Sequence, residues 1–297
     1  MRKKSGFTMV ELVMVIIVLG IVASIGADII SNLYTNYLRT RAVNRLQTQT
    51  EITLEQIAKR LQYRIKDSVI ARNNEGFKSL ASVAANEDYK TLEWIGYSNE
   101  SLRAEGKTPG WSGFIDLDHN STNEPAKTIF TPGSKLSDAQ QIIEALTYDT
   151  VDFAAKKPAI IFKEKSTFEI DEYGWDGGVN EHAFKISVED DETLKLDDFP
   201  DEVFEHYYLA HTAYALQPSN AVVLDNIEDF ELKLHYNYQP WHGEDLDDGD
   251  EAIIAKHVSL FRFKQDGDMI RLKLCLHDNK ESGLEDIIVA CKERVIY

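Results

Sequence analysis

Hydrophobic residues are concentrated at the start of the chain, where one long apolar run precedes a more polar remainder. From Phe7 to Ala27 the only charged side chain is Glu11. About 20 apolar residues can cross a bilayer as a helix, so this run predicts a membrane-spanning segment. A carboxylate inside such a run costs ~3 kcal/mol or more at mid-bilayer. Glu11 therefore needs a compensating partner.

The apolar pattern continues in a different form after residue 30. Between Leu46 and Val69, apolar side chains recur at steps of three and four residues, while basic and polar residues fill the other face. This is the pattern of an amphipathic helix. No proline precedes Pro109. We expect one helix from about Thr8 to Arg72, with residues 7–30 in a membrane or filament core and residues 31–72 packed against a sheet.

The remainder, residues 73–297, predicts a globular α+β head. Its fold class follows from period-two strand patterns, from an Asp266-Gly267 hairpin turn and from one short helix at Asp138–Leu146, capped by Ser137 with Gln140. The whole chain is then a long N-terminal helix against an antiparallel sheet. The expected strands are Thr91–Tyr97, Ala159–Phe162, Ala183–Val188, Thr212–Leu216, Ala221–Leu224, Phe230–Tyr236, Val258–Phe263 and Met269–Leu276.

The residues that begin the apolar run carry a specific motif. Lys4 to Leu12 read KSGFTMVEL, which resembles the processing motif of type IV prepilins and type II secretion pseudopilins. The resemblance implies that a prepilin peptidase cuts between Gly6 and Phe7 and methylates the new Phe7 amine, so that residues 1–6 are a leader peptide. It also implies that Glu11 pairs with the N-terminal amine of a neighbouring subunit during assembly. Position 28 is Asp, where major pilins often carry proline, and this departure favours a minor pilin or pseudopilin.

Two other interpretations of the N-terminus remain open. An ordinary secretory signal has a shorter apolar core than this one, although Val22-Ala23-Ser24 offers a cleavage site. A plain signal anchor explains the length and the basic flank of Arg2, Lys3 and Lys4. Neither explains Gly6-Phe7 followed by Glu11.

Charge places limits on the head's partners. The formal net charge is −18, and residues 73–297 alone carry −24. A body this acidic argues against direct binding to nucleic acid backbones. Acidity also keeps an exported domain soluble, which is the simpler interpretation.

The two cysteines are the clearest covalent feature of the head. Cys275 and Cys291 would both lie on the oxidising side of the membrane, which favours one disulfide. An outer strand at Glu285–Val295 would bring them together. Two buried free thiols are the alternative.

A calcium loop is the best ligand hypothesis for the head. Asp116, Asp118 and Asn120 place oxygen ligands at alternating positions. The glycine that an EF-hand needs at the sixth position is replaced by Ser121, which excludes an EF-hand and leaves another oxygen-rich loop. The chain contains no catalytic serine elbow, phosphate-binding glycine loop or His-Glu-x-x-His motif.

The sequence therefore predicts a non-enzymatic minor pilin or pseudopilin that needs no cofactor unless calcium is bound. It would sit in the inner membrane as a single-pass protein with its head in the periplasm, then join a pilus or pseudopilus. Its partners would be the prepilin peptidase, other pilin or pseudopilin subunits and the inner membrane. The alternative is a bitopic inner-membrane protein with a periplasmic ligand-binding or enzymatic domain.

Overall fold

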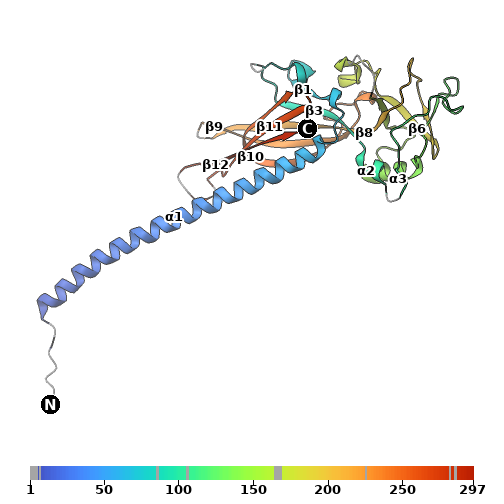
Figure 1. Cartoon of the computed structure of the whole chain (residues 1–297). Coiled ribbons are helices and arrows are strands. Elements are labelled where there is room, and N and C mark those ends of the chain that lie inside the picture. The colour runs from blue at the N-terminus through green and yellow to red at the C-terminus, as the bar shows by residue number, and fades with distance from the viewer. Residues whose placement is uncertain are drawn as a thin grey trace.

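The structure of the protein is a computed structural model, and one long helix with a large sheet dominates it (Figure 1). The described residues are 6, 8–84, 87–104, 107–163, 169–224, 226–280, 282–283 and 286–297. The fold class is α+β, as the sequence predicts.

The helix α1 (Met9–Leu61) is a curved rod whose two halves meet different surroundings. Its 53 residues make it about 80 Å long at ~1.5 Å per residue. The N-terminal half extends away from the head, and the second half lies along the sheet (Figure 1). Buried residues appear only from Ala42 onward, on the face that contacts the strands: Ala42, Leu46, Thr50, Thr53, Leu54, Ile57, Ala58 and Leu61.

The expected continuation of α1 to Arg72 is wrong, because the chain turns into the sheet after Leu61. The Arg64 guanidinium donates to the Leu61 carbonyl at 2.8 Å, which satisfies one of the last carbonyl groups of the helix. Its other hydrogen bonds reach the carbonyls of Asp268 at 2.7 Å and Tyr297 at 3.3 Å. The backbone N–H of Ile65 then donates to the carbonyl of Ile95. Contacts distant in sequence thus end the helix.

The described residues contain twelve strands, all paired antiparallel, in one extended sheet system. The main path runs β12-β11-β10-β9-β8-β5-β6-β7-β4, and β1, β2 and β3 join it through the pairing of β3 with β8. The strands are β1 (Ile70–Asn73), β2 (Gly76–Ser79), β3 (Thr91–Tyr97), β4 (Thr128–Phe130), β5 (Ala159–Phe162), β6 (Phe184–Asp190), β7 (Thr193–Leu196), β8 (Tyr207–Leu224), β9 (Ile227–Tyr238), β10 (Asp250–Asp266), β11 (Met269–His277) and β12 (Val289–Ile296).

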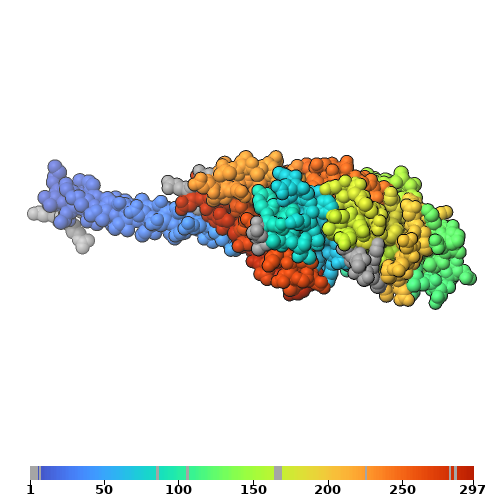
Figure 2. All heavy atoms as spheres, turned by 90° about the horizontal axis from the view of Figure 1, so that it is seen from above, coloured from blue at the N-terminus to red at the C-terminus, as the bar shows by residue number. Residues whose placement is uncertain are grey.

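The head is elongated, with its core divided along its length. Near α1, the buried face of the helix packs with apolar side chains of β9 to β12. At the far end, Trp111 and the helix α3 (Leu136–Leu146) form a separate core with β5, β6 and β7. Figure 2 shows this second lobe, which also holds α2 (Asn99–Arg103), at the end of the head farthest from the stalk.

Most expected strands are confirmed, and two local expectations need correction. The Asp266-Gly267 turn joins β10 to β11, with Gly267 at φ +58°. The runs at 212–216 and 221–224 belong to the single strand β8. The short helix begins at Leu136, with Lys135 at the N-cap, so Ser137 does not cap it. Instead, the Asp191 carboxylate accepts from the backbone N–H of Ser137 at 3.1 Å. The Ser137 side chain and, to a smaller extent, its backbone N–H lower the pKa of Asp191, which lies in the β6–β7 turn.

Candidate anchoring and assembly site

The N-terminal half of α1 exposes apolar side chains around its whole circumference. Within the described residues, α1 is the one helix that is long and apolar enough to cross a membrane. None of the residues in its most apolar stretch is buried. A helix that is hydrophobic all round requires apolar surroundings. The head does not supply them, so a bilayer or other helices must.

Gly6 has no structural reason to be glycine within the chain. A Cβ atom built on it would meet no other atom within 4 Å. Phe7 and residues 1–5 lie outside the described residues. Within the described residues, packing therefore does not require glycine at position 6.

Glu11 has a role at the start of α1 that the sequence analysis missed. The Thr8 hydroxyl accepts from the backbone N–H of Glu11 at 3.4 Å, and the Thr8 N–H donates to the Glu11 carboxylate at 3.5 Å. The two contacts form a capping box, and the spacing Thr8-x-x-Glu11 is its sequence signature. Both distances are long and both residues are exposed, so this cap is weak. The pairing of Glu11 with a neighbouring subunit stays a prediction.

The disulfide between Cys275 and Cys291 is confirmed. The two residues are directly opposite each other in the register of β11 and β12. The expected outer strand at 285–295 corresponds to β12, and Glu285 itself lies outside the described residues. The bond fastens the two strands against which the second half of α1 packs.

The loop predicted to bind calcium is already organised by internal hydrogen bonds. Oδ1 of Asp116 accepts from the backbone N–H of Asp118 at 3.0 Å, the pattern of an Asx turn. Asp118 and Asn120 are exposed. Calcium binding here stays a prediction.

A second group of potential metal ligands was not predicted. Asp229, His257 and His277 lie on β9, β10 and β11, and their ligand atoms are all within 4.8 Å of one another. The three residues are far apart in sequence and match no metal-binding spacing. Only the sheet register brings them together.

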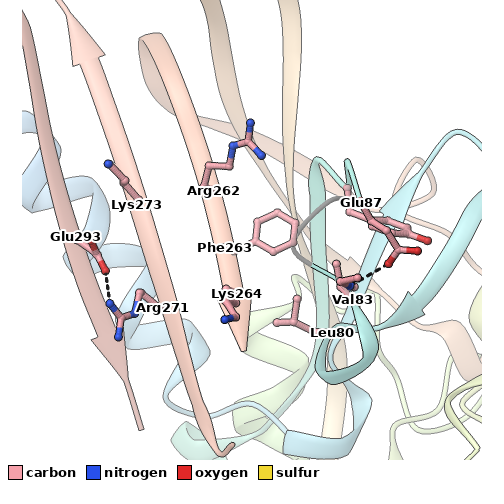
Figure 3. Close-up of a pocket in the computed structure, with 11 residues that line it drawn as sticks. Leu80, Val83, Glu87, Arg262, Phe263, Lys264, Arg271, Lys273 and Glu293 are labelled. Atoms are coloured by element: carbon pink, nitrogen blue, oxygen red, sulfur yellow. Dashed lines mark hydrogen bonds and ion pairs between the residues drawn. The ribbon is translucent and has the colours of Figure 1, made fainter. Parts of the chain in front are cut away.

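A basic groove lies on the head beside the β10–β11 hairpin (Figure 3). It encloses about 310 Å³. Arg262 is directly opposite Lys273, and Lys264 is opposite Arg271. Arg271 forms an ion pair with Glu293 at 2.9 Å. Leu80 and Val83 line the groove from the segment after β2, and Phe263 lines it from β10, between Arg262 and Lys264 (Figure 3). Glu87 also lines the groove, so its four basic side chains share it with two carboxylates.

The comparisons with known proteins concern the N-terminus alone. A family model described as the prokaryotic N-terminal methylation motif matches residues 1–27. No curated protein and no solved structure matches the chain. The match covers the leader, Gly6, Glu11 and the first turns of the exposed helix. Residues 1–27 therefore carry the type IV prepilin-like methylation signal of the pilin and pseudopilin superfamily.

Proposed function

We propose that this protein is a non-enzymatic structural subunit, a minor pilin or pseudopilin, of a type IV pilus or type II secretion pseudopilus. The observation that carries the proposal is the uncovered apolar half of α1 directly behind the methylation signal. Before assembly this segment would span the inner membrane with the head in the periplasm. After assembly the same surface would be covered by the helices of neighbouring subunits.

The size of the head supports a rare position in the filament. The second lobe, with α2 and α3, projects at the end of the head farthest from the stalk (Figure 2). Such a lobe hinders close lateral packing of identical copies. A subunit at the tip or base of the fibre avoids that steric conflict.

Processing is the first test of the proposal. The mature chain should begin with N-methyl-Phe7 and contain 291 of the 297 residues. Replacing Gly6 with Val should leave the leader attached, because the peptidase site accepts only a small residue there. Gly20→Val is the matched control, since a Cβ at Gly20 also meets nothing within 4 Å. Intact-mass measurement of the protein from cells with an active prepilin peptidase reports both. An unprocessed wild-type chain would end the proposal.

Glu11 is the second test, because assembly needs its charge to be paired. Removing one partner of a buried ion pair costs ~3–5 kcal/mol. We expect Glu11→Leu to insert into the membrane as well as wild type does, yet to be lost from purified filaments. Glu11→Gln should insert normally and also assemble poorly.

The capping box provides the control for this experiment. Thr8→Ala removes the hydroxyl that accepts from the Glu11 N–H but keeps the carboxylate. If Thr8→Ala assembles normally while Glu11→Leu does not, pairing with a neighbour is the cause. If Glu11→Leu assembles like wild type, the bitopic membrane protein with a periplasmic ligand-binding or enzymatic domain becomes the better interpretation.

A further inference from the structure

Three side chains from the neighbouring strands β9, β10 and β11 converge beside the second half of α1. Nδ1 of His257 is 3.2 Å from one oxygen of Asp229, and Nε2 of His277 is 3.3 Å from the other. In a tetrahedral zinc site with bonds of ~2.0–2.1 Å, neighbouring ligand atoms are ~3.3 Å apart. Each histidine nitrogen lies at about that spacing from one carboxylate oxygen, and one ligand atom from each of the three residues lies within 4.8 Å of the others.

The burial of the cluster indicates that something is missing from it. The His277 side chain is fully buried, and that of Asp229 is only 11% exposed. Nε2 of His277 has no hydrogen-bond partner of acceptable geometry among the described residues. Buried polar atoms are almost always satisfied. A buried imidazole nitrogen that lies 3.3 Å from a carboxylate oxygen without a well-formed hydrogen bond is a position that a metal ion would complete.

The backbone is also distorted at this point. His257 has φ +55°, in the left-handed region, although it lies inside β10. The register of β10 with β9 shifts between Ala255 and Val258, and β10 changes partner here from β9 to β11. Bulges of this kind redirect a side chain, and backbone strain is concentrated at ligand sites.

A groove between α1 and β10 reaches the two histidines of the cluster. The groove encloses about 470 Å³ and is lined by both histidines together with Gln49 and Thr53 of α1. This space admits an ion and a water molecule as its fourth ligand. Lys256, which also lines the groove, is paired with Glu231 at 3.3 Å.

We propose that Asp229, His257 and His277 form a zinc site with three protein ligands and one open position facing the groove. Two imidazoles and a carboxylate are a common donor set for this ion. The site would join β9, β10 and β11 beside the second half of α1. It is independent of the filament function and adds to it.

One rearrangement accompanies binding. The backbone N–H of Asn279 donates to Nδ1 of His277 at 3.2 Å, so the proton of the neutral ring is on Nε2. A zinc ion on Nε2 requires the other tautomer, with the proton on Nδ1. The Asn279 amide must then turn away, and Asn279 belongs to the turn after β11.

The test uses the full chain in detergent, stripped of metal with a chelator and then titrated with Zn²⁺ by calorimetry. We expect one equivalent bound, a higher melting temperature with zinc and the visible absorption of tetrahedral Co²⁺ when cobalt replaces it. Asp229→Asn, which is nearly isosteric, should weaken zinc binding at least tenfold and abolish the thermal shift.

Two further variants keep the result interpretable. His257→Gln changes a half-buried ligand and should weaken binding as Asp229→Asn does, even if a change at the buried His277 unfolds the head. Glu172→Gln is the matched control, because it breaks another histidine–carboxylate contact, 3.0 Å from His182, that belongs to no three-ligand group within the described part of the chain. It should bind zinc as wild type does. A wild-type chain that takes up no zinc, or equal affinity in all variants, would overturn the proposal.

Discussion

The two halves of α1 form one continuous helix but are stabilised by opposite surroundings. Up to about residue 37, large apolar side chains are more than half exposed, as with Leu19 at 66%. From Ala42 to Leu61 one stripe is buried against the sheet, and Leu61 is 0% exposed. The first half is apolar all round and the second is amphipathic. The first half is therefore suited to partners outside the molecule, and the second to its own head.

Substitution of two leucines, one in each half of α1, tests this difference most directly. Leu61→Ala should lower the free energy of unfolding of the head by about 2–5 kcal/mol, because it leaves a cavity in the core. Leu19→Ala removes the same atoms from the exposed first half of α1 and should change the free energy of unfolding of the head by less than about 0.5 kcal/mol. Urea unfolding in detergent, followed by the fluorescence of the four tryptophans, which all lie in the head, measures both. Similar losses in the two variants would show that the halves are not independent.

The same comparison explains what sequence could predict of α1. The stripe from Leu46 to Leu61 was predictable, because helical periodicity is local. The end of the helix was not, because Arg64 is held by the carbonyls of Asp268 and Tyr297, far along the chain. Ile65 and Val69 continue the apolar spacing and are buried. They reach the core from outside the helix.

The strands show a similar division. Long alternating runs such as Met269–Leu276 were predictable, and so was the four-residue β5, because all of its side chains are apolar. The strands β4 and β7 are as short and mix polar with apolar residues, so they were missed. Pro218 lies within β8, between the two runs that the sequence analysis gives as separate strands. It is tolerated because it pairs with Leu232 of β9 beyond Leu216, where the pairing with β3 on the other edge begins.

The candidate sites divide by how local their signals are. Gly6, Phe7 and Glu11 are neighbours in sequence and form a motif. Asp229 meets two histidines only through the register of three strands, which no spacing rule contains.

The disulfide tests whether the stability of the head can change without affecting the first half of α1. Replacing Cys275 and Cys291 with Ser together should lower the free energy of unfolding by roughly 3 kcal/mol, because the unfolded chain loses a 16-residue cross-link. The helix content of the exposed first half of α1 should stay unchanged. Urea midpoints with and without reductant measure the effect. Reductant should shift wild type but not the double variant, and alkylation of two thiols in native, unreduced protein would contradict the bond.

Low pH should destabilise the head but not the exposed first half of α1. Burial lowers the pKa of His211 to about 4, below its ordinary value of 6.5. Between these values the unfolded chain binds the proton and the folded head does not. The contribution of His211 is therefore fully present above pH 6.5 and is lost as the pH falls towards 4.

The expected loss from this residue between pH 7 and pH 5 is on the order of 2 kcal/mol. His211→Leu should flatten the pH dependence of head stability by that amount. His206→Gln, at an exposed position just before β8, should leave it unchanged. Urea unfolding at the two pH values measures the slope. An equal slope in wild type and His211→Leu would assign the acid sensitivity to other groups.

The smallest expected effect concerns an ion pair between α1 and β12. Arg294 of β12 and Glu55 of α1 form an ion pair at 2.5 Å, with side chains that are 40% and 43% exposed. Exposed pairs contribute about 0–1 kcal/mol, because water screens the attraction and both side chains lose freedom. A double-mutant cycle with Glu55→Gln and Arg294→Gln should give a coupling free energy within that range, and added salt should reduce it. A coupling well above ~1 kcal/mol that resists salt would mean that charge holds the helix on the sheet. The expected result leaves that task to the buried stripe that ends at Leu61.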